Sequence, residues 1–302
     1  MNVGFFLEVL LGGLMAGMLY SLVALGFVLI FKASGVFNFA QGAMVLFAAL
    51  SLVRIIEIFH VPLVVAIAAT IGIMVLLAMA IERLVLRPLV NQPGITLFMA
   101  TLGITFFLDG FGQSIWGSDI YKLDLGIPKQ PIIFLEKTFE GGVLVGSDDL
   151  VATAAAALLV AALALFFQKT RVGRARRAVA DDHQAAQSVG IPLNHIWVIV
   201  WTVAGIVALV AGMVWGSKLG VQFSLSLVAL KALPVVILGG FTSIPGAIAG
   251  GLIIGAGEKL SEVYLGPLIG GGIENWFAYV LALVFLLVRP EGLFGEKHID
   301  RV

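Results

Sequence analysis

Long runs of apolar residues recur along this chain, and they limit its fold more than any other feature. The first run, Val9 to Phe31, contains no charged residue. A bilayer core about 30 Å thick requires roughly 20 apolar residues in a helix, because every backbone N–H and C=O group must be satisfied within the segment. Further runs lie at about 35–53, 61–82, 95–115, 150–167 and 195–216, an interrupted pair spans 226–262, and a last run lies near 270–288. The sequence therefore predicts an all-α, polytopic transmembrane bundle of about 8 to 9 spans.

The composition narrows the possible functions. Hydrophobic residues make up 60% of the chain and charged residues 12%, whereas soluble chains carry about 25% charged residues. The 18 basic residues balance the 18 acidic ones, so no positive field attracts nucleic acid. The chain has no Cys, and its four His residues are scattered without a His-Glu-x-x-His pattern. We expect a single transmembrane domain over residues 1–302, surrounded by lipid, with no nucleic-acid partner, no metal site and no catalytic residues.

Basic residues beside the spans predict the orientation, because such residues stay preferentially in the cytoplasm. The densest group consists of Lys169, Arg171, Arg174, Arg176 and Arg177. Placing this loop inside predicts an external N-terminus and a cytoplasmic C-terminus. The longest polar stretch, 117–149, then lies outside, with room for a short hairpin. This stretch is either a functional loop or a simple connector.

Proline and glycine interrupt the apolar segment 231–251, at Pro234, Gly239, Gly240, Pro245 and Gly246. A regular helix cannot run through all of these positions. One reading is a discontinuous membrane helix whose freed backbone groups face a translocation path, which would include Ser243 and Pro245. The other reading is a short turn outside the membrane between two tilted helices.

Two polar stripes interrupt the apolar spans. The first consists of Ser34, Asn38 and Gln41, and the second of Thr101, Thr105, Asp109 and Gln113. Their spacings of three and four place each stripe on one helical face. Because polar groups are costly in lipid, both stripes should face the bundle interior, where they either line a path or bond across helices. Stripes of small residues, such as Gly13, Gly17 and Ser21 or Ala204, Ala208, Gly212 and Gly216, indicate close helix packing.

The basic loop, at about 169–194, predicts a surface helix over 174–189 that suits a groove on a partner. Its run Arg171-Val-Gly-Arg-Ala-Arg-Arg-Ala178, followed by Ala185, Ala186 and Gly190, resembles the cytoplasmic loop of branched-chain amino-acid ABC transporter permeases. Two further stretches occur in the same order in that family. They are Ala24-Leu-Gly26 with Asn38-Phe-Ala-Gln-Gly42, and Leu238-Gly-Gly-Phe-Thr-Ser-Ile-Pro-Gly-Ala247. The resemblance covers nearly the whole chain.

The resemblance implies a permease subunit of an importer in the bacterial inner membrane. It implies a second, different permease subunit, two ATP-binding-cassette ATPases and a periplasmic solute-binding protein. The residues that would couple to the ATPases are Arg174, Arg177, Asp181, Ala185, Ala186 and Gly190. Two departures, Gln41 where a His is expected and Gln184 where a Glu is common, leave the cargo open between branched-chain amino acids, urea, short amides and other small solutes.

ATP must be bound by partner subunits, because the chain contains no G-x-x-x-x-G-K-[ST] motif. An alternative is a secondary transporter driven by protons or sodium, which needs carboxylates within its spans. Asp109, Glu258 and Glu274 are the available candidates. An intramembrane enzyme would require clustered acids or histidines, and none are apparent in the sequence.

Overall fold

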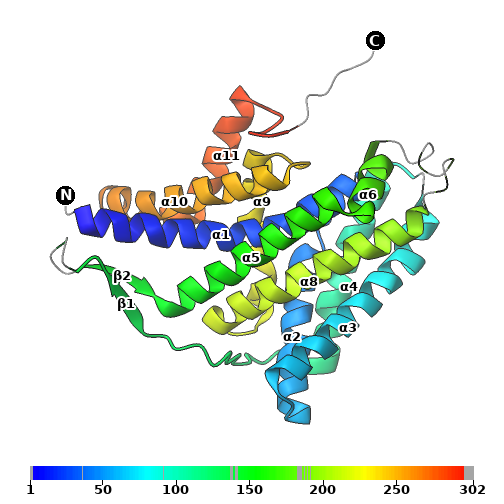
Figure 1. Cartoon of the computed structure of the whole chain (residues 1–302), viewed down its shortest axis with the longest axis horizontal. Helices are drawn as coiled ribbons and strands as arrows, with labels where there is room; N and C mark the ends of the chain where they lie inside the picture. The colour runs from blue at the N-terminus through cyan, green and yellow to red at the C-terminus, as the bar shows by residue number, and fades with distance from the viewer. Residues whose placement is uncertain are drawn as a thin grey trace. The chain divides into compact units, whose positions relative to one another are not determined.

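The computed structural model describes residues 3–35, 37–90, 92–136, 139, 142–181, 186, 188, 190 and 192–295. Most of these residues are helical (Figure 1). Contacts divide the chain into two compact units, which are described separately below. The first contains residues 1–24, 126–159 and 230–302, and the second contains residues 25–125 and 160–229. Helices α1 (Val3–Ser34), α5 (Ser147–Lys169) and α9 (Val228–Gly239) contribute residues to both units.

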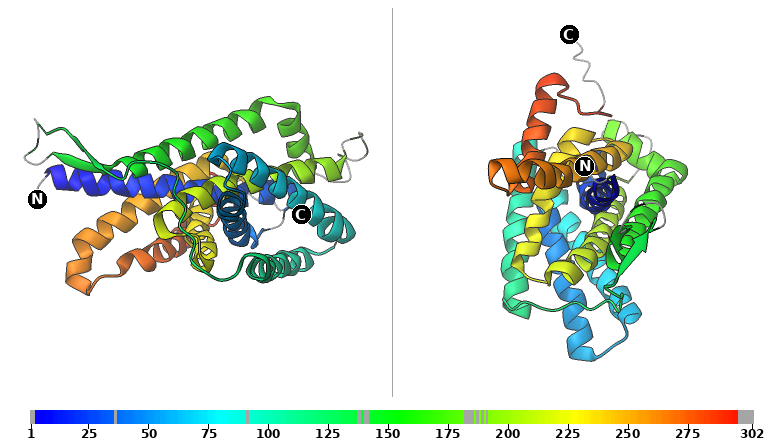
Figure 2. Two further views of the ribbon diagram at one scale, coloured as in Figure 1. Left: turned by 90° about the horizontal axis from the view of Figure 1, so that it is seen from below. Right: turned by 90° about the vertical axis from the view of Figure 1, so that its left-hand side faces the viewer.

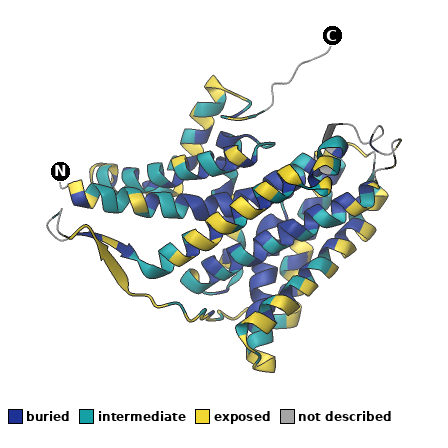
Figure 3. Cartoon of the chain, viewed as in Figure 1, coloured by how far each residue is buried: buried dark blue, intermediate teal, exposed yellow. Residues whose placement is uncertain are grey.

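The second unit is built around α2 (Gln41–Phe59), which packs against α3 (Leu63–Ile81), α4 (Gly94–Trp116), α8 (Leu193–Leu219) and the 3₁₀ turn η3 (Phe223–Leu227). Helix α3 continues into a π-helical turn, η1 (Glu82–Leu86), and a 3₁₀ turn, η2 (Arg87–Leu89). Helices α2 and α8 are largely buried along their length, as the dark blue segments of this unit in Figure 3 show. The small-residue stripe of α8 is buried, and a Cβ on its Gly212 would lie 2.8 Å from the Val45 carbonyl oxygen of α2.

The first unit contains the hairpin strands β1 (Pro131–Phe134) and β2 (Val143–Gly146) and the helices α10 (Ile244–Ile269) and α11 (Phe277–Val288), with the 3₁₀ turn η4 (Ile273–Asn275) between these two helices. The hairpin is antiparallel, with Pro131 opposite Gly146. Helices α1 and α10 lie side by side in both views (Figures 1 and 2). A Cβ on Gly17 would lie 2.3 Å from the Gly251 carbonyl oxygen, so glycine allows these backbones to touch.

The predicted all-α polytopic fold is confirmed. Six described helices are long and apolar enough to span a membrane: α1, α2, α3 with its extension, α4, α5 and α8. The pair formed by Phe223–Gly239 and Ile244–Ile269 is bent by 115°, and α11 is a shorter apolar helix. Two predicted boundaries are wrong. The second span begins at Gln41, not near residue 35, and α11 begins at Phe277, not near residue 270.

Candidate functional site

Two buried amides, Asn38 and Gln41, shape the connection between α1 and α2. The Asn38 Oδ1 atom accepts the Ala40 N–H at 3.1 Å, which forms a local turn before α2 begins. The Asn38 Nδ2 atom donates to Gln41 Oε1 at 3.4 Å, and the Gln41 Nε2 atom donates to the Ala204 carbonyl of α8 at 3.4 Å. Both side chains have no exposed surface. The connection is thus held by hydrogen bonds between three segments of the second unit.

The sequence placed Ser34, Asn38 and Gln41 on one helical face, and this placement is wrong. Helix α1 ends at Ser34, where the next residue, Gly35, has a φ of +68° and turns the chain out of the helix. Ser34 is half-buried and its hydroxyl donates to the Ile30 carbonyl at 2.8 Å. Asn38 and Gln41 meet because the turn brings them together, not because they share a helix.

The glycines of the two early motifs have a steric role around Gln41. A Cβ on Gly26 would lie 2.1 Å from the Gln41 Nε2 atom. Because Gly26 has no side chain, the Gln41 amide packs directly against the backbone of α1. A Cβ on Gly42 would lie 2.2 Å from the Ser226 carbonyl oxygen, so this glycine lets α2 approach η3. The Ala24-Leu-Gly26 and Asn38-to-Gly42 motifs therefore form one packed joint.

Thr101 of α4 contacts the same joint. Its buried Oγ1 atom accepts the Phe39 N–H at 3.3 Å and lies 3.2 Å from the Phe37 carbonyl, to which it can donate. An aromatic cluster surrounds this contact, in which Phe37 stacks on Phe27 at 4.8 Å and Phe39 meets Phe98 edge-on at 4.8 Å. Thr101 thus joins α4 to the α1–α2 connection.

The rest of the second polar stripe is less buried than Thr101. Thr105 and Asp109 are half-buried and Gln113 is exposed, while the buried face of α4 carries Leu97, Thr101, Ile104, Leu108 and Gly112. The Thr105 hydroxyl donates to the Thr101 carbonyl at 2.9 Å. The Asp109 Oδ1 atom has no hydrogen-bond partner among the described residues. The stripe is inclined across α4 and only its first member enters the core.

The predicted break between α9 and α10 lies at residues 240–243. Gly240 has a φ of +99°, Ser243 caps α10 by accepting the Gly246 N–H at 3.0 Å, and Pro245 occupies the first turn of α10. The carbonyls at the end of α9 are satisfied by the C-terminal segment. Leu293 N–H donates to Leu238 at 2.8 Å and Phe294 N–H donates to Gly239 at 3.1 Å.

The basic loop begins with α6 (Arg171–Asp181), which overlaps the helix predicted over 174–189 at residues 174–181. Residues 182–185, 187 and 189 of that prediction lie outside the described residues. Arg177 Nη1 donates to the Phe167 carbonyl near the end of α5 at 3.1 Å, and α6 packs on α8 with Val179 fully buried. Arg174 is exposed. Ala186 is buried and Gly190 is exposed with a φ of +84°. Ala185 and the side chain of Asp181 lie outside the described residues.

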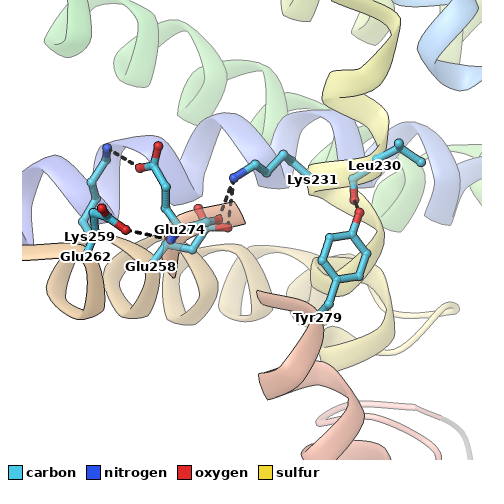
Figure 4. A network of polar contacts seen from close by, with 7 residues as sticks. All are labelled: Leu230, Lys231, Glu258, Lys259, Glu262, Glu274 and Tyr279. Atoms are coloured by element: carbon cyan, nitrogen blue, oxygen red, sulfur yellow. Dashed lines mark hydrogen bonds and ion pairs between the residues drawn. The ribbon is translucent and has the colours of Figure 1, made fainter. Parts of the chain in front are cut away.

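A network of charged side chains in the first unit was not predicted as a site (Figure 4). Lys231 Nζ of α9 lies 3.6 Å from the buried Glu258 Oε1 of α10 and donates to the Glu274 carbonyl of η4 at 2.7 Å. Lys259 Nζ pairs with Glu274 Oε2 at 3.1 Å, and the Glu262 carboxylate accepts the Gly272 and Glu274 N–H groups at 2.9 and 3.0 Å. The signal in the sequence was Lys and Glu inside apolar helices.

Comparisons with known proteins agree along nearly the whole chain. The family model described as "Branched-chain amino acid transport system / permease component" matches residues 9–289. The high-affinity branched-chain amino acid transport system permease protein LivH of Salmonella typhimurium is 28% identical over 309 residues, which cover 99% of this chain and 98% of LivH. The permease protein BraD of Pseudomonas aeruginosa is 28% identical over 307 residues, covering 98% of each chain. The solved structure of PsaBC from Streptococcus pneumoniae in complex with Fab aligns with 14% identity and a TM-score of 0.45, covering 93% of this chain and 90% of that chain.

Proposed function

Because this chain belongs to the family of permease components of branched-chain amino acid transport systems, we propose that it forms the translocation path of an ATP-driven importer. The chain is a multi-pass inner-membrane protein and a transport subunit, not an enzyme. The observation that carries the proposal is the family match, which extends over residues 9–289.

The cargo of the importer is a branched-chain amino acid, the substrate class that the names of the LivH and BraD relatives give. Binding and selection fall to a periplasmic solute-binding protein, so the path itself needs only weak contacts. Candidates for these contacts are Thr105 in the second unit and the break at Ser243 and Pro245 in the first. Asn38, Gln41 and Thr101 are further candidates that are fully buried here, so they would reach the cargo only when the helices of the second unit separate. Ser34 and Asp109 are the remaining candidates. Urea, short amides or another small solute are the alternative cargo, because Gln41 departs from the family pattern.

Helix α6 is the contact for the ATPases. Its exposed basic residues, such as Arg174, can meet a partner, while Arg177 and Val179 fix the helix to α5 and α8. A push on α6 therefore moves two spans. This assignment places the loop and the C-terminus in the cytoplasm and the N-terminus outside. The complex contains a second permease subunit and two ATPases, which bind the ATP.

An ion-coupled transporter is the weaker proposal. Glu258 and Glu274 are each paired with a lysine, and a carboxylate neutralised by a fixed lysine is poorly suited to carry a proton or sodium ion. Asp109 Oδ1 and Glu258 Oε1 both lack a hydrogen-bond partner in the described part of the chain, but Glu258 Oε1 lies 3.6 Å from the Lys231 ammonium.

Proteoliposomes test the proposal. The permease pair is reconstituted with the ATPases, the binding protein and radiolabelled leucine, and uptake is measured with and without ATP at the ATPase side. Uptake should require both ATP and the ATPases and persist with a protonophore. Uptake that follows an imposed proton or sodium gradient without ATPases would disprove the proposal. Thermal-shift measurements on the binding protein with leucine, urea and acetamide identify the cargo.

A further inference from the structure

An apolar groove of about 400 Å³ lies on the second unit, between α4 and the end of α3 with its π-helical turn. Its lining includes Leu77, Leu84 and Val85 on one side and Ala100, Gly103 and Phe107 on the other, and every lining residue is apolar. Leu84 and Phe107 are 73% and 62% exposed. On spans of a membrane protein, an exposed groove of this composition is filled by hydrocarbon.

Gly103 opens the floor of the groove. A Cβ built on this residue would meet no atom within 4 Å. Unlike Gly13 and Gly17 of α1, Gly103 therefore does not serve a close contact with another described part of the chain. Its missing side chain leaves space for a ligand.

Two arginines flank the groove at the end of the span. The helical segment Leu63–Leu89 has 27 residues, which is about 40 Å of helix and exceeds a hydrocarbon core of about 30 Å. Its last turns, with Arg83 and Arg87, thus reach the headgroup level. Arg87 is neutralised by two hydrogen bonds to the buried Glu82, at 3.0 and 2.9 Å. Arg83 is exposed and has no ion-pair partner in the described part of the chain.

We propose that this groove binds an anionic phospholipid, with an acyl chain along Gly103 and the phosphate at Arg83. Basic sites beside transmembrane helices bind anionic lipid headgroups in this way. A partner helix fits less well. A helix about 10 Å across occupies about 420 Å³ per turn, so the groove would hold only one turn, whereas it accommodates a long stretch of a narrow acyl chain. Arg83 also supplies the positive charge that a phosphate requires and an apolar helix does not.

Native mass spectrometry on the purified full-length protein tests the site with two lipids that share their acyl chains, dioleoyl-phosphatidylglycerol and dioleoyl-phosphatidylcholine. The protein should retain phosphatidylglycerol preferentially. Arg83→Gln should reduce this preference about fivefold, the contribution of one basic residue near a lipid surface. Gly103→Phe should abolish the retention by filling the groove. Gly110→Phe is the matched control, because Gly110 lies on the same helix, also has open space around its Cβ, and does not line the groove.

Three results would overturn the proposal. The first is equal retention of the two lipids by the wild type, and the second is unchanged retention by Gly103→Phe. The third is that Gly103→Phe keeps the lipid but loses association with another permease subunit, which would make the groove a protein interface.

If Gly103→Phe fails to fold, the site is tested on the wild-type protein by cross-linking with phosphatidylglycerol that carries a photoactivatable acyl chain. Its cross-links should fall on residues 77–85 and 100–108, and cross-links elsewhere contradict the site.

Discussion

Replacing Lys231 with Met should destabilise the protein strongly, because it leaves a buried carboxylate without its counterion. Lys231 Nζ lies 3.6 Å from Glu258 Oε1, and Glu258 is 2% exposed. Its second hydrogen-bonding group is the Tyr20 hydroxyl, which carries no charge. Removing one partner of a buried pair costs about 3–5 kcal/mol. Because 28% of the Lys231 side chain is exposed, we expect the lower end, about 3 kcal/mol.

The partner substitution should cost less. In Glu258→Gln the ammonium of Lys231 keeps its 2.7 Å bond to the Glu274 carbonyl and its contact with solvent, so we expect about 1–2 kcal/mol. The double variant removes both charges and should be nearly as stable as wild type, since neutral replacements of buried pairs are often tolerated. A double loss near zero against single losses of about 3 and about 1–2 kcal/mol corresponds to a coupling energy of about 4–5 kcal/mol, above the range of about 0.5–3 kcal/mol that is usual for residues in contact.

The assay is unfolding of the purified protein in mixed micelles by increasing fractions of sodium dodecyl sulfate, followed by tryptophan fluorescence. Lys259→Met is the matched control. Its partner Glu274 and its own side chain are 40% and 44% exposed, so the loss should stay below about 1 kcal/mol. The reasoning is refuted if Lys231→Met costs no more than Lys259→Met, or if adding Glu258→Gln fails to restore stability.

Three further predictions test other parts of the account. Gly17→Val should separate α1 from α10 and cost about 1–3 kcal/mol in the same unfolding assay, while Gly12→Val, which meets open space, should be nearly neutral; equal losses would contradict the packing. Gln41→Ala and Asn38→Ala should each lower leucine uptake several-fold while the complex still assembles, and unchanged uptake in both would count against a role in the path. Gly173→Ala puts a Cβ 1.8 Å from the Phe167 carbonyl oxygen, which forces α6 away from the end of α5. ATPase binding in pull-downs should therefore weaken, and wild-type binding would contradict a role of the α5–α6 contact in holding the ATPases.

The fold was largely predictable because the bilayer dictates it. Backbone groups in lipid must be satisfied within a helix, so most of the apolar runs became helices long enough to span it. The last run, predicted near 270–288, forms only the 12-residue helix α11. The start of the second span, at Gln41, was predicted wrongly because of local hydrogen bonding. The periodicity of Ser34, Asn38 and Gln41 fits a helix, but the Asn38 side chain accepts the Ala40 N–H and stabilises a turn instead. Glycine at position 35 completes the break.

The charged network was not predictable from spacing. Lys231, Glu258 and Glu274 belong to three elements that are far apart in sequence, and only the bent α9–α10 pair brings them together. In the sequence, each of these charged residues can be read either as marking the end of a membrane span or as a candidate carrier of a coupling ion. The contact between Gln41 and Gly26 joins the motifs Ala24-Leu-Gly26 and Asn38-to-Gly42. The sequence showed that these motifs follow one another along the chain, but it could not show that they touch.

The side of the membrane on which α6 lies tests the central claim most directly. The chain has no Cys, so Arg174→Cys and, in a second variant, Ile132→Cys in β1 each provide one exposed thiol for a membrane-impermeant maleimide. The account predicts that Arg174→Cys reacts in inside-out vesicles and is protected by the ATPases, whereas Ile132→Cys reacts in intact spheroplasts. Labelling of Arg174→Cys from the outer face of spheroplasts would contradict the account.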